Sequence, residues 1–310
     1  MNTAPNDRDV QIINIISRLE QLRPHSEREK YAIEQNVAFF KSIRSVALYL
    51  QWVFGVRKHI RREDLLEINE LLAELDEIFH AKMAEIERRP NPGIVTPAVD
   101  FVTDHAIHIS HGERVRLVSL GSGSMEIERQ AIERLQKGGY TSPMTIVGLD
   151  LAPNARVYAE KNLRSLVQVR VVQETQLTEE RMFSLEKETK ESVLVIIADN
   201  DIFSLASEFT PHVFDLSMTL LLLHHLSTEK RIQLVNMMRI VASHTLNYDG
   251  YRSEIAFLFL SLTGWHSPIF LNAAVFSTVR FPSKSEVVHL HSNAQITFYK
   301  HGHYRAIFPA

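Results

Sequence analysis

Two glycines and two aspartates are spaced so that together they could hold a nucleoside. Gly121 and Gly123 stand in the run Val118-Ser119-Leu120-Gly121-Ser122-Gly123-Ser124, which closes one expected strand and opens an expected helix. Asp150 ends the next expected strand, and Asp199 ends a later one. Glycine lets the backbone approach a ligand closely, and a strand-tip carboxylate can accept hydrogen bonds from ribose hydroxyls. The pattern favours a nucleotide-type cofactor over the plainer alternative of a simple turn and two exposed loop aspartates.

A histidine pair follows another expected strand. His224 and His225 come directly after the apolar run 214–221. Histidine titrates near neutral pH, so we take His224 as the candidate base for an acceptor hydroxyl. The alternative is that the pair caps the strand and orders the loop. Further candidates for contact with an acceptor are His225, His244, Tyr248, Tyr251 and Arg252, the last of which could equally be a structural ion-pair partner.

The 15 histidines also raise the question of a metal site, and we expect none. His105, His108 and His111 lie in a stretch expected to be helical and lack an acidic ligand at a recognised spacing. Two other pairs alternate in expected strands without further ligands, namely His289 with His291 and His301 with His303.

The elements that position these residues read as an α/β fold. Short apolar runs alternate with helical patterns, which predicts a Rossmann-like, mostly parallel sheet with helices on both faces. The expected strands are 115–120, 144–149, 167–172, 193–198 and 214–221, and the expected helices are 126–136, 153–164 and 228–241. The polar stretch 173–192 is interpreted as a surface insertion. In the tail, 254–262 and 269–276 look helical, and 286–290 with 295–299 could form an antiparallel pair at the sheet edge.

The first part of the chain differs in character. Apolar residues at helical spacing predict one long helix over 26–55 and a second over 65–86. Two prolines and a glycine at 90–93 then mark a boundary. We therefore expect an N-terminal all-α cap over 1–92 and an α/β domain over 93–310. The aromatic residues Phe39, Phe40, Tyr49 and Trp52 could line a lid over the acceptor, although a plain helical bundle would explain the same pattern.

Taken in order, the runs SLGSGS, IVGLD, IIADND and FDLSMTLLLLHHL resemble the class I S-adenosylmethionine-dependent methyltransferases, over roughly 115–241. The segments DGYRS and STVRFP extend this to the bacterial small-molecule enzymes of that class. The resemblance implies S-adenosyl-L-methionine as the cofactor and methyl transfer to an oxygen, nitrogen or carbon atom of a small molecule. The α/β domain would then be the methyltransferase domain.

The resemblance also implies a role for each candidate residue toward the methionine portion, the ribose, the adenine and the methyl group of the cofactor. The methionine portion would be held by Leu120, Gly121, Ser122 and Gly123, and the ribose by Asp150. Leu151 would pack on the adenine face, and Asp199 with Asn200 would lie at the adenine edge. Thr219 and Leu220 would line the methyl-donor side.

Three departures from the family pattern keep alternatives open. Ser119 stands where the family usually has an acidic residue, Met125 where a third glycine is common, and 242–246 where a Pro-Gly-Gly turn is usual. Met125 could crowd the loop. One alternative is aminopropyl or aminocarboxypropyl transfer of the nicotianamine synthase kind, to which SLGSGS is also similar. Another is a non-catalytic module that retains the fold.

Composition excludes several function classes. With 34 basic and 37 acidic residues, the formal charge of −3 offers no field to attract nucleic acid, and the short basic run 56–62 reads as a solvated helix face. No apolar window is long enough to span a membrane. The absence of cysteine and of a signal-peptide pattern fits a cytoplasmic protein. We expect a small-molecule partner, no membrane or nucleic-acid partner, and leave a homodimer open.

Overall fold

The computed structural model describes residues 7–72, 95–254 and 267–308, together with positions 75, 78, 81, 83–85, 88 and 257. The chain divides into two compact units. The helical unit comprises residues 1–79 and 251–283, and the sheet unit comprises residues 80–250 and 284–310. This differs from the predicted division at residue 92, because the segment 251–283 joins the helical unit, where its apolar side chains lie in the core of the N-terminal helices.

The sheet unit is built on eight strands in the order β3-β4-β2-β1-β5-β6-β8-β7. The first six are parallel, and β8 and β7 add an antiparallel edge. The predicted α/β class and antiparallel edge are therefore confirmed. The strands are β1 (Val115–Leu120), β2 (Met144–Leu149), β3 (Val169–Glu174), β4 (Val193–Ala198), β5 (Phe214–Leu220), β6 (Ala242–Gly250), β7 (Gln295–Phe298) and β8 (His303–Phe308).

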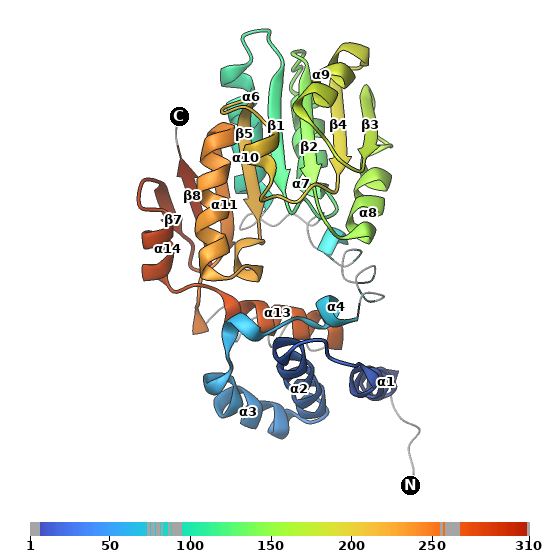
Figure 1. The fold of residues 1–310 in the computed structure, drawn as a ribbon, viewed down its shortest axis with the longest axis vertical. Helices are drawn as coiled ribbons and strands as arrows, with labels where there is room; N and C mark the ends of the chain where they lie inside the picture. Colours follow the sequence, from blue (N-terminus) through green and yellow to red (C-terminus); the bar gives the residue numbers. More distant parts are fainter. Residues whose placement is uncertain are drawn as a thin grey trace. The chain divides into compact units, whose positions relative to one another are not determined.

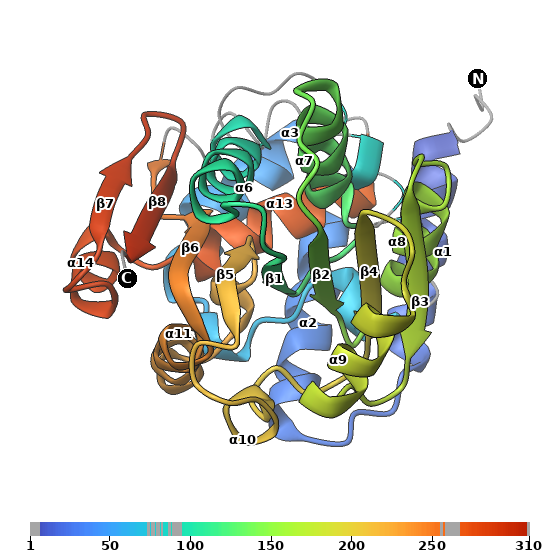
Figure 2. The ribbon, with the colours of Figure 1, turned by 90° about the horizontal axis from the view of Figure 1, so that it is seen from above.

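Helices cover both faces of this sheet, as Figures 1 and 2 show. Strands β2 and β4 are buried along their whole length, as expected for apolar strands in the middle of a parallel sheet. One apolar core joins the sheet to three helices, and a second core joins its other face to three more. The first three are α6 (Val95–Ile109), α7 (Glu126–Lys137) and α8 (Pro153–Leu163); the others are α9 (Glu179–Glu188), α10 (Leu205–Glu208) and α11 (Thr228–Val241).

Several parts of the sheet unit differ from the sequence-based prediction, which listed neither β6 nor β8 and placed β3 two residues too early. The stretch 173–192 is not an insertion, because α9 within it buries Met182 and Leu185 and forms the crossover from β3 to β4. The segment predicted as the strand 286–290 is the helix α14 (Lys284–Leu290). The edge hairpin is instead β7 with β8, and Gly302 supplies the positive φ of +88° that its turn requires.

The helical unit contains shorter helices than predicted. The expected helix over 26–55 is interrupted at 43–45, where the Ser45 side chain accepts a hydrogen bond from the backbone of Leu48 and starts a new helix. Residues of the expected helices 65–86 and 254–262 lie in part outside the described residues. The helices are α1 (Asp7–Gln21), α2 (Glu27–Ser42), α3 (Val46–Phe54), α4 (Ile68–Leu71) and α13 (Pro268–Arg280), with 3₁₀ turns η1 (Val56–His59) and η2 (Arg62–Asp64).

The aromatic residues Phe39, Phe40, Tyr49 and Trp52 form the core of this unit, as the interpretation of the N-terminal part as a plain helical bundle predicts. The Phe39 ring lies 5.3 Å from the ring centroids of both Trp52 and Phe276, and it also contacts Phe40 and Tyr49 edge-on. Trp52 stacks on Phe276 at 6.1 Å. Because Phe276 comes from α13, this cluster explains why 251–283 folds with the N-terminal helices. Among the described residues, every helix is too short or too polar to traverse a lipid bilayer.

Candidate functional site

The candidate cofactor residues meet at one rim of the sheet. Leu120, Leu149 and Ala198 are paired across β1, β2 and β4, at the carboxyl end of each strand. Gly121, Asp150 and Asp199 are the next residues in each case, so they lie side by side just beyond the strand ends. Ligands of open α/β sheets bind at this edge. The predicted convergence of these three residues is present in the structure.

The glycine loop is fastened to β2 and to its terminal aspartate. Gly121 and Ser122 both donate their backbone N–H to the Leu149 carbonyl, at 2.8 and 3.1 Å. The Asp150 carboxylate accepts from the Gly123 N–H at 2.8 Å and from the Ala152 N–H at 2.9 Å. Gly121 and Gly123 have φ of +64° and +53°, which favours glycine at both. Asp150 therefore holds the loop in shape.

The same loop is open to a ligand. A Cβ built on Gly123 would meet no atom within 4 Å, so its backbone is accessible. The Ser122 hydroxyl is buried and has no hydrogen-bond partner among the described residues. Leu151, predicted to pack on an adenine, is 64% exposed, unusual for a large apolar side chain. An orphaned hydroxyl, an accessible backbone and an exposed apolar side chain fit the nucleoside-type cofactor that the sequence predicts.

Met125 does not crowd the loop, contrary to our expectation. It adopts the left-handed conformation, with φ of +52°, that a glycine would adopt there. Its side chain turns into the core, where a Cβ on Gly148 would lie 2.6 Å from the Met125 sulfur. The missing Cβ of Gly148 thus makes room for the methionine.

Two predicted cofactor residues are engaged elsewhere. The Asn200 side chain accepts from the Leu177 N–H and donates to the Leu177 carbonyl, both at 2.8 Å, and also donates to Glu208. It therefore holds the connection after β3 and does not present its amide to an adenine edge. The Thr219 hydroxyl donates to the Leu120 carbonyl at 3.1 Å. Thr219 joins β5 to β1, so Leu220, half-buried, is the member of this pair nearer to the solvent.

Asp199 keeps a place at the rim, where it forms an ion pair. Its carboxylate lies 3.0 Å from the Arg156 guanidinium, which also donates to the Asp150 carbonyl at 3.3 Å. Leu222 is a further neighbour of the loop, since a Cβ on Gly121 would approach its side chain to 3.0 Å. Sequence reasoning missed both Arg156 and Leu222, because neither belongs to a motif.

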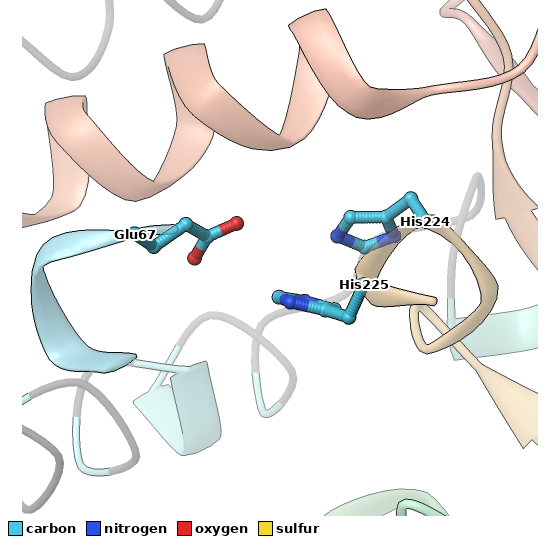
Figure 3. A group of neighbouring side chains, drawn as sticks. All are labelled: Glu67, His224 and His225. Atoms are coloured by element: carbon cyan, nitrogen blue, oxygen red, sulfur yellow. The ribbon is translucent and has the colours of Figure 1, made fainter. Parts of the chain in front are cut away.

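The histidine pair lies on the 3₁₀ turn η4 (Leu223–His225), which follows β5. The two rings are 4.1 Å apart, and Figure 3 shows them side by side. His224 Nδ1 lies 2.8 Å from Asp249 Oδ1, and the His224 backbone N–H donates to Asp249 Oδ2 at 3.0 Å. Glu67, also labelled in Figure 3, belongs to the helical unit, where its carboxylate accepts from Ser277.

Asp249, the partner of His224, is a candidate site residue to which the sequence analysis assigned no role. It follows Tyr248 at the end of β6, and its carboxylate also accepts from the Gly250 N–H. Burial pushes the pKa of Asp249 upward, but the charge and hydrogen bond of His224 and two backbone N–H bonds outweigh it, so its pKa is lowered. Its position next to the last residue of β6 would have pointed to it, but the sequence analysis listed no strand over 242–250.

The remaining acceptor candidates are dispersed. Tyr248 is fully buried against Tyr299 and His303, and this burial raises the pKa of its hydroxyl well above the usual range. His244 is paired with Leu216 near the amino end of β6, away from the rim at which the strands end, and its predicted contact with an acceptor stays a prediction. Tyr251 and Arg252 belong to the helical unit, where the Arg252 N–H donates to the Pro282 carbonyl, and their predicted substrate contacts stay predictions.

Comparison with known proteins identifies the fold. No family model matches the chain, and no curated protein matches it by sequence. The plantazolicin methyltransferase BpumL, solved with a monoazolic desmethylPZN analog and SAH, is 12% identical over 97% of this chain and 100% of that chain, with a TM-score of 0.50. A putative S-adenosyl-L-methionine-dependent methyltransferase from Methanococcus maripaludis is 14% identical over 76% of this chain and 93% of that one, with a TM-score of 0.42. The class I methyltransferase fold predicted from the motifs is therefore confirmed as a fold.

Proposed function

We propose that this chain is an S-adenosyl-L-methionine-dependent methyltransferase that acts on a small molecule at oxygen, nitrogen or carbon. The observation that carries the proposal is the fastening of the glycine loop to Asp150 at the shared rim of β1, β2 and β4. A structure of the same fold, BpumL, was solved with SAH, the product form of this cofactor. The proposal extends that ligand class to the present chain.

The residues of the loop would hold the methionine portion, with Asp150 at the ribose and Leu151 against the adenine. When bound, S-adenosyl-L-methionine supplies a methyl group on a positively charged sulfur, so the reaction needs no covalent help from the protein. Positioning the acceptor is then the main task of the chain. The Asn200 side chain is left out of this proposal because its amide is bound to Leu177.

His224 is the proposed base for an acceptor that must lose a proton. In this proposal the neutral His224 carries its proton on Nδ1, donates it to Asp249 across the 2.8 Å contact, and offers the lone pair of Nε2 as the base. The lowered pKa of Asp249 keeps its carboxylate ionised and able to stabilise the imidazolium that forms. Asp249 is a positioning residue in this arrangement.

Cofactor binding is the first test. Titration calorimetry with S-adenosylhomocysteine should give a measurable Kd, and Asp150→Asn should weaken binding at least tenfold, since the amide cannot accept from both backbone N–H groups and a ribose. Asp201→Asn is the matched control, because Asp201 follows β4 closely and its contacts among the residues that the structure describes are local ones, to the Phe203 N–H and to Ser204. Absence of binding to the wild-type chain at millimolar ligand would favour the non-catalytic alternative.

The group transferred is the second test. S-adenosyl-L-methionine labelled on its methyl carbon should transfer the label to an acceptor found by screening small molecules. Label that stays on the spent cofactor while product forms would contradict methyl transfer and favour transfer of the aminopropyl or aminocarboxypropyl group.

We further propose a cytoplasmic location, on the support of a chain without cysteine. The formal charge of −3 gives no support to a nucleic-acid partner. The homodimer and the role of the N-terminal helices as a cap stay predictions.

A further inference from the structure

The chain lacks an acidic residue at the position where related proteins hold the amino group of the cofactor. Ser119 occupies this position, one residue before the end of β1. Val118 and Leu120 face the core shared with α9, α10 and α11, so Ser119 faces the opposite side, toward α7. A serine hydroxyl cannot neutralise an ammonium group. The charge must come from another residue if the site is to bind S-adenosyl-L-methionine.

Glu128 brings a carboxylate to the side chain of Ser119. It lies in the first turn of α7, which begins directly after the glycine loop. The side chains of Ser119 and Glu128 are neighbours, and hydrogen bonding from the Ser119 hydroxyl and the Glu128 backbone lowers the pKa of this carboxyl, against the effect of burial. The residue is only 2% exposed. The carboxylate therefore lies in the angle between the end of β1 and the start of α7, beneath the loop that joins them.

One oxygen of this carboxylate has no partner. Glu128 Oε1 is buried and makes no hydrogen bond to any residue that the structure describes. Burial, with a smaller effect of the neighbouring Glu126 charge, raises the pKa of Glu128 to about 7, although the bonds from Ser119 and the backbone oppose the shift. A buried carboxylate oxygen without a hydrogen-bond partner destabilises the folded state unless a ligand or another residue binds to it.

The neighbouring cations do not supply that pairing. Glu126 shares the first turn of α7 and binds Arg129 at 2.7 Å and Arg88 at 3.1 Å. On α6, Asp100 is paired with Arg134. Asp150, at the rim, accepts from Gly123 and Ala152. Arg88, Arg129 and Arg134 are thus engaged by other carboxylates, and within the described residues no ion pair reaches Glu128.

We propose that Glu128 replaces the missing acid at position 119 and is the counter-ion of the α-ammonium group of the cofactor. The proposal rests on the proposed function and assigns it a residue outside the loop motif. Ser119 positions the carboxylate, and the glycine loop above it admits the ammonium group. Ionised Glu128 is stabilised once the ligand is bound, because a charge-assisted hydrogen bond replaces an unpaired oxygen.

The experiment compares two ligands by titration calorimetry at pH 8. S-adenosylhomocysteine carries the amino group, and its deaminated analogue lacks only that group. The wild-type chain should bind S-adenosylhomocysteine at least tenfold more tightly than the analogue, and Glu128→Gln should bind the two equally. The double variant Ser119→Asp, Glu128→Gln should recover the preference, since it returns the acid to the family position.

Controls separate this proposal from the proposed function. Glu133→Gln, on the same helix and paired with Arg129, should keep the wild-type preference. If the wild-type chain binds neither ligand, the proposed function fails. If it binds S-adenosylhomocysteine and Glu128→Gln keeps the full preference for the amino group, the cofactor assignment stands and the role of Glu128 is wrong. Circular dichroism of each variant shows whether a loss of binding reflects a loss of fold.

Discussion

The two halves of the rim of the sheet unit are built in different ways. At the ends of β1, β2 and β4, the contacts are made largely by backbone N–H groups, which reach a strand-tip carboxylate and a carbonyl on the neighbouring strand. At the ends of β5 and β6, the central contact joins two side chains, His224 and Asp249. The first half is suited to a cofactor that many proteins share. The second half, where we propose that the acceptor binds, adds a contact between two side chains to the backbone bonds of Asp249.

The largest effect should come from substitutions of His224 and Asp249 at the ends of β5 and β6, which we call the side-chain half of the rim. We expect His224→Gln and Asp249→Asn to reduce methyl transfer to the screened acceptor by about 10²- to 10⁴-fold, the usual range for general base catalysis. The affinity for S-adenosylhomocysteine should stay unchanged, because the other half holds the cofactor. His244→Gln is the control, because His244 lies near the amino end of β6, away from the rim. Equal losses of cofactor affinity and rate would contradict the division between the halves.

A second prediction concerns how the free energy of unfolding depends on pH through Glu128, which lies beside the ends of β1, β2 and β4. We call these strand ends the cofactor half of the rim. The pKa of Glu128 is about 7 in the folded chain against 4.5 for a free acid, so between these values the folded state keeps a proton that the unfolded state has lost. Stability therefore falls as pH rises through this window, by roughly 3 kcal/mol in all.

Glu128→Gln removes this dependence. The variant should be more stable than wild type at pH 8, and the difference should vanish near pH 4.5. Urea unfolding at the two pH values measures the free energies of unfolding. A difference that does not change with pH would show that Glu128 titrates normally. Saturating S-adenosylhomocysteine should reduce the difference in free energy of unfolding between variant and wild type at pH 8, because the ligand stabilises the wild type more than the variant.

A third prediction tests whether Asn200 belongs to the cofactor half. Asn200→Ala should lower the free energy of unfolding by about 2 kcal/mol, because it leaves buried backbone groups of Leu177 without partners. The affinity for S-adenosylhomocysteine should change less than twofold, measured by calorimetry. A larger loss of affinity would support the assignment of Asn200 to the adenine edge that the family resemblance implied.

The smallest effect is expected at the glycine loop. Gly121→Ala adds a Cβ 3.0 Å from the Leu222 side chain at a φ of +64° and should weaken S-adenosylhomocysteine binding about tenfold. Gly139→Ala is the matched control, since Gly139 has a φ of +76° but open space around its Cβ. Both variants should lose about 1 kcal/mol of stability from backbone strain. Equal affinities would show that the turn at Gly121 is only structural.

Much of the cofactor half could be predicted from the sequence for a physical reason. The strands β1, β2 and β4 were expected at their observed bounds because short, mostly apolar runs of six residues between turns fit buried parallel strands. Parallel strands of one sheet end at the same edge, so Gly121, Asp150 and Asp199 had to converge once the strands were adjacent. Their register was then fixed by backbone hydrogen bonds and needed no side-chain information.

Elements whose state depends on distant packing were predicted poorly. The segment 284–290 has a pattern compatible with a strand, and only its packing against α11 makes it helical. The stretch 173–192 is mostly polar, yet Met182 and Leu185 suffice to attach α9 to the sheet. For the aromatic residues of α2 and α3, the sequence left a lid and a helical bundle open, because it did not reveal that Phe276 would cover them.

The sequence by itself determined the α/β order, the glycine loop and the carboxylates at the strand ends, because these depend on local spacing and on backbone geometry that every parallel sheet shares. Tertiary structure alone decided which side chains pair across the fold. Asp249 orients His224 from 25 residues away, Glu128 reaches Ser119 from the next helix, and Asn200 turns to Leu177. Such pairs arise from close packing, in which each neighbour depends on the whole arrangement of the core.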